Sequence, residues 1–144
     1  MKFDEIIRKI KEVKIQGARN IAIAGLRAYS MRPTKKTIRK LLSLRKTEPA
    51  LRTALDYAER YSIKKALEHF EFSKEEIKRI GWKVVRKRVF THCHSSHVID
   101  VLKEAKKRGK KFEVYNSETR PLYQGRRTAK ELAKARIPVT MVSD

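Results

Sequence analysis

Residues 87–118, KRVFTHCHSSHVIDVLKEAKKRGKKFEVYNSE, decide the fold of this chain. Their first and last segments, KRVFTHC and KFEVYNSE, are short and rich in β-branched and aromatic residues, which favours strands. The segment between them, HVIDVLKEAKKRG, has the apolar spacing of an amphipathic helix that ends at Gly109. A strand, a helix and a strand in this order predict a right-handed βαβ crossover and a parallel sheet.

The same patterns extend outward in both directions. Downstream, GRRTAKELAKAR predicts a second helix and IPVTMVSD a third strand, so residues 86–144 are predicted to form a partial Rossmann-like domain of βαβαβ order. Upstream, residues 1–85 are predicted to form a helical domain, which gives an α/β protein with a helical N-terminal domain and a truncated three-stranded parallel sheet. Thr47 is predicted to cap one of these helices, and Ser73 to start another, with Glu76 at its capping-box position.

A sheet of three parallel strands has an open edge and a thin core. Parallel sheets are normally covered on both faces and extended by further strands. We therefore expect the sheet to be completed by another chain, by further copies of this chain, or by a continuation of the same protein.

The amino-acid composition limits the classes of partner and the cellular compartment that we expect for this chain. The formal net charge is +21, from 37 Lys and Arg against 16 Asp and Glu, which favours an anionic partner such as a phosphorylated metabolite, a nucleic acid or an acidic protein. A solvated basic surface without such a partner is the alternative. A single cysteine excludes an internal disulfide and favours a cytoplasmic setting, and no apolar run is long enough for a membrane span.

Polar stretches follow all three predicted strands: THCHSS, NSETRPLYQG and SD. In open α/β sheets, ligands bind at the carboxyl ends of the strands, close to helix N-termini. His92 and His94 would share one face of an extended strand, and His97 could join them as a zinc ligand, but the spacing matches no recognised metal motif and no metal is predicted. Cys93 is either a reactive thiolate or a small buried apolar residue.

Residues 91–144, from THCHSS to VTMVSD, closely resemble the central region of a family that unites three groups. These are the regulatory subunits of translation initiation factor 2B, their archaeal homologues, and the isomerases of ribose 1,5-bisphosphate and methylthioribose 1-phosphate. IQGARNIAIAGLRAY and LRKTEPALRTAL resemble the family's Gly-Ala turn and its RPTEPALRNAL segment. Within the family, the chain looks most like an archaeal ribose 1,5-bisphosphate isomerase or an archaeal initiation factor 2B-like protein.

The resemblance implies a set of functional residues. Cys93 matches the catalytic cysteine, which is the proposed proton acceptor of the isomerases. A 1,2-proton shift needs a base beside the sugar carbon, and a bisphosphate needs cations and helix N-termini at two ends. The implied substrate-binding residues are Gln16, Gly17, Ala18, Arg19, Arg45, Ser95, Ser96, His97 and Gln124.

The chain also departs from the isomerase pattern. Gln16 stands where the isomerases usually have arginine, and glutamine there also occurs among the initiation-factor subunits. Lys46 replaces a usual proline, and the family's general-acid aspartate and its Asn-Lys pair match no residue up to Asp144. Enzymatic activity is therefore left open: the expected function is a split or truncated sugar-phosphate isomerase, and the alternative is an initiation factor 2B-like regulatory subunit.

The expected partners follow from the resemblance, from the open edge of the sheet and from the net charge. They are a phosphorylated sugar or nucleotide, a second chain or further copies, and a translation factor or RNA. No cofactor is implied by the resemblance, and RNA binding ranks last because the chain has no recognisable RNA-binding module.

Overall fold

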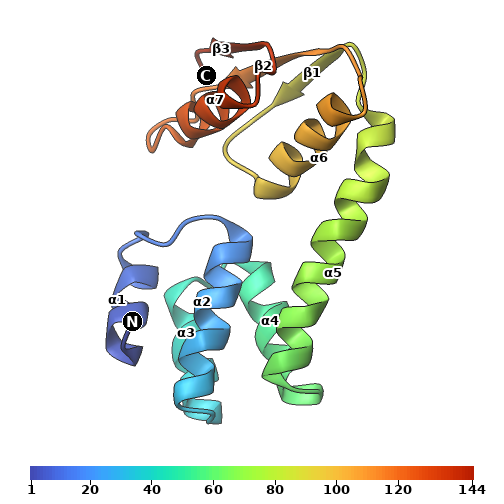
Figure 1. Cartoon of the computed structure of the whole chain (residues 1–144). Helices are drawn as coiled ribbons and strands as arrows, with labels where there is room; N and C mark the ends of the chain where they lie inside the picture. The colour runs from blue at the N-terminus through green and yellow to red at the C-terminus, as the bar shows by residue number, and fades with distance from the viewer. The chain divides into compact units, whose positions relative to one another are not determined.

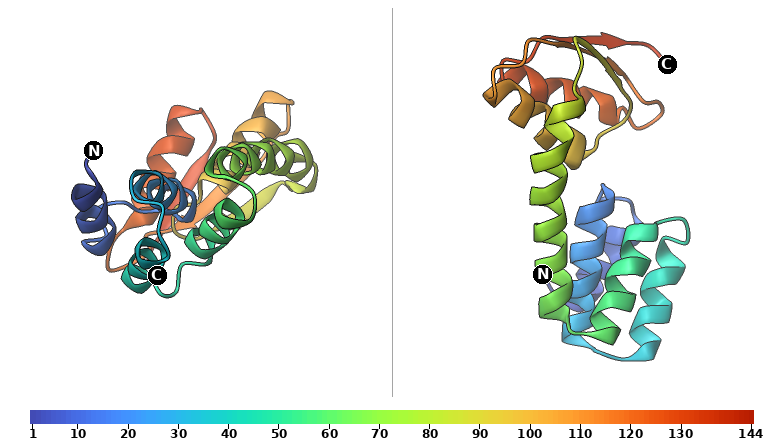
Figure 2. Two further views of the ribbon diagram at one scale, coloured as in Figure 1. Left: turned by 90° about the horizontal axis from the view of Figure 1, so that it is seen from below. Right: turned by 90° about the vertical axis from the view of Figure 1, so that its right-hand side faces the viewer.

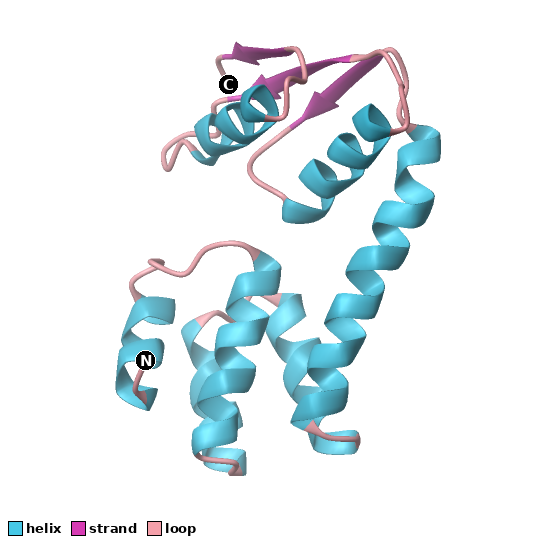
Figure 3. Ribbon diagram, viewed as in Figure 1, coloured by secondary structure: helices cyan, strands magenta, loops and turns pink.

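A computed structural model describes all residues of the chain, Met1 to Asp144, and divides them into two compact units. Unit 1 is Met1–Phe72 and unit 2 is Ser73–Asp144. Helices precede a three-stranded parallel sheet along the chain, as Figures 1 and 3 show, so the predicted α/β fold class is confirmed. No helix has both the length and the apolar character that a membrane crossing requires.

Unit 1 is a helical bundle in which α2 packs against α1, α3 and α4. Its core is made of aliphatic side chains at helical spacing, and Ile10, Leu41 and Leu55 are completely buried. Thr34 caps α3, because its side-chain oxygen accepts a hydrogen bond from the Thr37 N–H at 3.2 Å. The helices are α1 (Phe3–Lys11), α2 (Ala18–Met31), α3 (Lys35–Leu44), α4 (Pro49–Arg60) and the first part of α5 (Ile63–Gly81).

Two predicted helix starts are wrong. Glu48, rather than Thr47, caps α4, because its carboxylate reaches the Ala50 N–H at 3.4 Å. Ser73 starts no helix but lies inside α5, which is continuous. The cap of α5 is Ser62, whose hydroxyl accepts from the Lys65 N–H at 3.1 Å. The good helix formers on both sides of Ser73 carry the helix through this position, so the serine there needs no capping role.

The last turns of α5 and the short 3-10 helix η1 (Trp82–Val84) belong to unit 2. Val85 is buried in the core of that unit, and Trp82 packs against the same core. A Cβ atom on Gly81 would lie only 2.6 Å from Cγ2 of Val101, so α5 and α6 approach closely there. The chain changes from helix to strand near residue 86. The boundary between the two compact units lies earlier, between Phe72 and Ser73.

Unit 2 has three parallel strands in the order β1-β2-β3. Val89, Val114 and Val139 occupy one row across the sheet. The elements in chain order are β1 (Arg88–Thr91), α6 (Ser96–Lys107), β2 (Glu113–Ser117), α7 (Gln124–Lys134) and β3 (Val139–Val142). The predicted βαβαβ order is therefore confirmed.

Both helices of the crossovers cover the same face of the sheet (Figures 1 and 2). Beneath that face, Leu102 of α6, Val114 of β2 and Leu132 of α7 are completely buried. On the other face, Phe90 of β1 and Thr140 of β3 are exposed. The sheet is thus covered on one side only, and the core of unit 2 is a single layer.

Gly125 brings the start of α7 against the end of β2. A Cβ atom there would lie 1.8 Å from the main-chain oxygen of Ser117 and 2.9 Å from Nδ2 of Asn116. That amide nitrogen also donates to the Gly125 carbonyl at 2.8 Å. No side chain fits without moving main-chain atoms, so only glycine allows this approach.

We expect Gly125→Ala to destabilise unit 2 by about 2–3 kcal/mol, because the added methyl group must displace the end of β2. Trp82 is the only tryptophan, so its fluorescence during urea unfolding reports on unit 2. The exposed Lys130→Ala on the same helix is the control, with an expected change within about 0.5 kcal/mol. Equal stability of the two variants would contradict this account of the close approach.

Candidate functional site

The turn after β1 holds Cys93 in an unusual conformation. Its φ is +64°, in the left-handed region that non-glycine residues rarely adopt. The Cys93 N–H donates to Oγ1 of Thr119 at 2.8 Å, and Oγ1 of Thr128 donates to the Cys93 carbonyl at 2.7 Å. Both threonines are buried, so both main-chain groups of Cys93 are fixed by side chains from other segments. The thiol is free and half-buried.

The histidines on either side of Cys93 turn to different partners. Nδ1 of His92 lies 2.6 Å from Oγ of Ser117, and Nε2 of His94 lies 3.1 Å from Oε1 of Glu131. The prediction that His92 and His94 share a strand face is wrong, because β1 ends at Thr91. The structure contains no group of three or more metal-ligating side chains arranged to hold an ion.

Asp144 ties the loop after β2 to the end of β3. Its carboxylate accepts hydrogen bonds from the main-chain N–H groups of Arg120 and Thr119, the latter at 2.8 Å. These two N–H groups, from Arg120 and then Thr119, hold the pKa of the Asp144 carboxyl below its usual range. Thr119 therefore links Asp144 to the Cys93 turn, and the carboxyl ends of all three strands are joined.

Two glutamates near these loops are also kept ionised. The guanidinium groups of Arg126 and Arg120 lower the pKa of Glu118. Burial acts to raise the pKa of Glu131, but hydrogen bonds from His94 and Arg127 outweigh burial and lower it. Like Asp144, both side chains are acceptors at neutral pH and hold no proton to donate.

The other predicted residues of unit 2 lie at the starts of α6 and α7. Ser95 caps α6, with its side chain accepting from the Val98 N–H at 3.4 Å, and Ser96 is the first residue of the helix. His97 follows, and its Nε2 atom is buried without a hydrogen-bond partner. Gln124 is the first residue of α7. These helix N-termini and the Cys93 turn lie at the same edge of the sheet, as the sequence predicted.

The predicted residues of unit 1 lie at one end of its bundle. Gln16 and Gly17 precede α2, with Gly17 at φ +87°, and Ala18 is the first residue of that helix. Arg45 follows α3, which runs antiparallel to α2, so the start of α2 and the end of α3 meet at the same end (Figure 1).

Two arginines at this end have unsatisfied donors. Arg19 pairs with Glu71, yet its Nε atom is buried without a partner. Arg45 has a buried Nη1 atom that likewise lacks a partner. A buried guanidinium N–H without an acceptor is unfavourable, and an anion at this end of the bundle would supply one.

Sequence reasoning missed the residues that hold the Cys93 turn. Thr119, Thr128 and Asp144 lie 26, 35 and 51 positions after Cys93 by residue number, so no local pattern connects them. For Thr119 and Asp144 the usable signal was their position just after predicted parallel strands, because the carboxyl ends of such strands meet at one edge. That signal places a loop near Cys93 but does not identify the side chain that reaches it.

We expect Thr119→Val to destabilise unit 2 by about 1–3 kcal/mol, because it leaves the Cys93 N–H without its acceptor. Thr119→Ser keeps the hydroxyl and is the matched control, with most of the stability retained. Urea unfolding followed by Trp82 fluorescence measures both, and amide hydrogen exchange at Cys93 should become faster only in the valine variant. Unchanged exchange there would contradict the role of Thr119.

The Asp144 contacts should depend on pH. Because the pKa of Asp144 is lower in the folded chain, the folded state binds fewer protons than the unfolded state at acidic pH. The stabilisation is therefore present at neutral pH and is lost as the pH falls through the folded-state pKa. The amide NMR signals of Thr119 and Arg120 should titrate together in that range, and should not titrate in Asp144→Asn. Separate titrations would count against a shared carboxylate.

Comparisons with known proteins agree with the fold and the sequence resemblance. The family described as the Initiation factor 2 subunit family matches residues 20–144. Ribose 1,5-bisphosphate isomerase of Pyrococcus furiosus is 35% identical over an alignment 177 positions long. The alignment covers 97% of this chain and 54% of that protein. The chain thus spans about half the length of the curated relatives it matches.

Solved structures show the same fold. The translation initiation factor eIF-2B of Pyrococcus horikoshii superposes with a TM-score of 0.86 at 23% identity, covering 98% of this chain and 59% of that one. A subunit of the tetrameric eIF2B-beta2-delta2 complex of C. thermophilum gives a TM-score of 0.65 at 18% identity, covering 96% and 58%. The resemblance inferred from the sequence is confirmed, and the chain belongs to the Initiation factor 2 subunit family.

Proposed function

We propose that this chain binds a phosphorylated sugar, with ribose 1,5-bisphosphate as the first candidate, and that it acts as one part of a sugar-phosphate isomerase. The observation that carries the proposal is the pair of buried guanidinium nitrogens without partners, on Arg19 and Arg45. A phosphate group is the anion best suited to such donors, because guanidinium N–H groups bind phosphate oxygens with strong charge-assisted hydrogen bonds. The name of the Pyrococcus furiosus relative supports the choice of sugar.

The proposal assigns phosphate binding in unit 1 to the start of α2 and the end of α3. Gly17 has a positive φ at the start of α2, and the first N–H groups of a helix attract anions. Arg19 and Arg45 would add the unsatisfied side-chain donors. Gln16 and Ala18 complete the proposed set at this end of the bundle.

In unit 2 the proposal assigns the proton acceptor to Cys93. The turn that carries the thiol is fixed by two buried threonines, since the Cys93 N–H donates to Thr119 and Thr128 donates to the Cys93 carbonyl. The Asp144 carboxylate in turn accepts from the Thr119 N–H. A base in a 1,2-proton shift must be held in position beside the reacting carbon, and a fixed turn supplies this. Ser95, Ser96, His97 and Gln124, at the adjoining helix starts, are the proposed substrate contacts of this unit.

The isomerisation also needs a proton donor, and the carboxylates tied to this turn are poorly suited to that role. Asp144 and Glu131 both have lowered pKa values, so they carry no proton at neutral pH. We therefore infer that these 144 residues bind the sugar phosphate without turning it over, and that a second polypeptide segment would donate the proton.

An initiation factor 2B-like regulatory role is the second candidate. It is favoured by Gln16, an exposed residue where the resemblance places an arginine in the isomerases. A regulatory subunit would use the fold for assembly, as in the tetrameric complex that matches this fold. We propose that the chain likewise works within an assembly in either role.

We expect calorimetric titration of ribose 1,5-bisphosphate into the purified chain to show saturable binding without isomerase turnover. Arg45→Ala should weaken binding about 10-fold or more, because a charged donor to phosphate contributes about 1.5–3 kcal/mol. Arg39→Ala is the matched control, since Arg39 is an exposed arginine on the same helix α3, and it should leave the affinity nearly unchanged.

Three comparators separate the candidate functions. AMP tests a nucleotide, inorganic phosphate tests the anion site alone, and a short RNA at the same salt tests nonspecific charge. Equal loss of binding in both arginine variants, or binding of RNA only, would refute the sugar-phosphate site. Rapid turnover by the chain alone would refute its role as half of an active site.

A further inference from the structure

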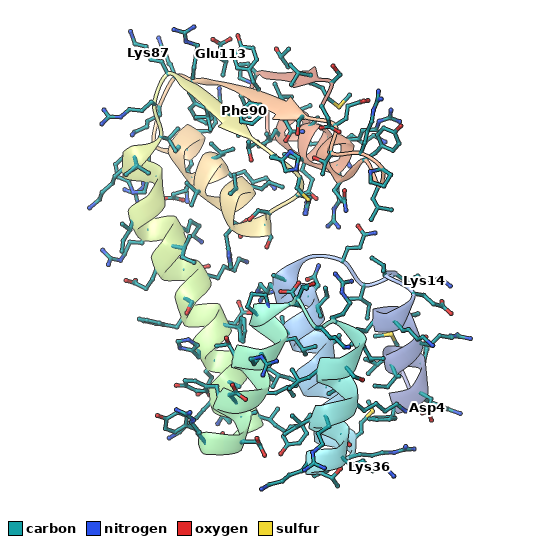
Figure 4. All side chains as sticks on the ribbon, turned by 180° about the vertical axis from the view of Figure 1, so that it is seen from behind. Asp4, Lys14, Lys36, Lys87, Phe90 and Glu113 are labelled. Atoms are coloured by element: carbon teal, nitrogen blue, oxygen red, sulfur yellow. The ribbon has the colours of Figure 1, made fainter.

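One end of the unit 1 bundle carries a group of exposed cations. The chain passes this end twice, between α2 and α3 and again between α4 and α5 (Figures 1 and 2). Lys36 marks this end in Figure 4. Arg45 lies at the opposite end, because Lys36 is near the start of α3 and Arg45 follows its last residue. We call the group the basic end, and its members are Arg32, Lys35, Lys36, Arg60, Lys64 and Lys65.

Most of these cations have no carboxylate partner. Only two of the six form an ion pair, Arg32 with Asp4 at 3.8 Å and Lys64 with Glu68 at 3.9 Å. Ion pairs this long between exposed side chains contribute little. No Asp or Glu occurs in residues 13–47, so the connection from α2 to α3 carries no acidic residue. The basic end therefore keeps a positive potential that an extended anion would neutralise.

Aromatic rings lie at the same end of the bundle. The Tyr57 ring stacks on His69, with ring centroids 4.8 Å apart and planes 12° apart. The centroid of Tyr61 lies 4.6 Å from that of Tyr57. Tyr61 directly follows α4 and is 60% exposed, and the Lys65 ammonium lies 6.0 Å from its ring centroid. The Tyr61 ring thus offers an open aromatic surface beside the cations.

A pocket of about 360 Å³ opens beside these rings. It is formed by one face of α4 and is lined by Thr53, Asp56, Tyr57, Arg60 and Tyr61. Its volume falls within the range of small-ligand pockets, about 300–1,000 Å³. The exposed Asp56 carboxylate would repel a phosphate, but it can accept hydrogen bonds from the amino group of a nucleobase. The pocket therefore suits a base, with phosphates held outside it by the cations.

Rings and cations together favour single-stranded nucleic acid over other anionic partners. Proteins bind single strands by placing cations along the phosphates and aromatic side chains against unpaired bases. The bases of a duplex are already stacked on their neighbours and leave no open ring for Tyr61. An acidic polypeptide would neutralise the cations, but its carboxylates would be repelled by Asp56 in the pocket.

We propose that the basic end and the pocket beside Tyr61 bind single-stranded nucleic acid, with one base stacked on Tyr61 and the neighbouring phosphates on the lysines and arginines. This site lies at the opposite end of the bundle from Arg45, so it goes beyond the proposed sugar-phosphate binding and does not depend on it. Because Asp56 accepts from amino groups, we expect cytosine to bind better than uracil at the stacked position.

The first test titrates the full chain into a fluorescein-labelled RNA of about eight cytidines, a length within the usual site size of single-strand binders. Tyr61→Ala should weaken binding about 5-fold or more, because stacking of a base on an aromatic ring contributes at least this much. Phe72→Ala is the matched control, since Phe72 is a 66% exposed aromatic residue in the middle of α5. It should change the affinity less than about twofold.

The second test measures the salt dependence of the same binding. Replacing Lys35 and Lys36 by alanine should reduce the slope of log Kd against log salt concentration by about 1.4, because each phosphate contact to a single strand contributes about 0.7. Replacing Lys106 and Lys107 is the matched control, since they are an adjacent exposed pair on α6 of unit 2. Equal effects of the two double variants would show that only net charge matters, and would overturn the proposal.

Three further probes identify the class of partner. Tighter binding of the RNA than of DNA with the same sequence would assign recognition of the 2′-hydroxyl, and equal binding would assign single strands of either kind. A duplex and an oligoglutamate of similar length should both bind more weakly than the single strand. The proposal is overturned by binding of either one as tightly as the single strand, by equal effects of Tyr61→Ala and Phe72→Ala, or by no saturable binding of RNA or DNA.

Two controls separate this site from the proposed sugar-phosphate site. Addition of ribose 1,5-bisphosphate and the variant Arg45→Ala should both leave the affinity for the RNA nearly unchanged, because Arg45 lies at the other end of α3. Displacement of the RNA by the sugar phosphate, or equal losses in Arg45→Ala and Tyr61→Ala, would rule out a separate site. A chain that binds no sugar phosphate would leave these RNA measurements unaffected, so the two proposals fail separately.

Discussion

The hydrogen bond from the Cys93 N–H to Thr119 is the contact on which the candidate site of unit 2 depends. It joins the turn after β1 to the loop after β2, and Asp144 holds that loop from the end of β3. A cysteine with its backbone in the left-handed region is unfavourable by itself. The conformation persists because buried partners satisfy both the N–H and the carbonyl of Cys93. Parallel pairing makes this possible, since it gathers the carboxyl ends of the three strands at one edge.

Some ionised side chains of the chain have all the hydrogen-bond partners they need, and others do not. Glu118, Glu131 and Asp144 are engaged by arginines, a histidine or main-chain N–H groups, and their pKa values are lowered. Arg19 and Arg45 instead keep buried donors without acceptors. The proposed anion site is placed at these two arginines for that reason, and not on the basis of the net charge of the chain.

The sheet of unit 2 is covered by helices on one face only. The two helices of unit 2 cover one face and leave Phe90 exposed on the other. An edge strand, an apolar groove and an exposed sheet face occur together at β1.

The sequence by itself determined the family, the α/β class and the βαβαβ order, because strand and helix periods and the family motifs are local patterns. It also placed polar loops at the strand ends. It wrongly predicted helix caps at Thr47 and Ser73. Glu48 caps α4 instead, and α5 continues through Ser73 without a break. Only the tertiary structure decided that Thr119, Thr128 and Asp144 hold the Cys93 turn, and that His92 and His94 diverge, because these contacts join residues far apart in the chain, whose meeting depends on strand register and packing.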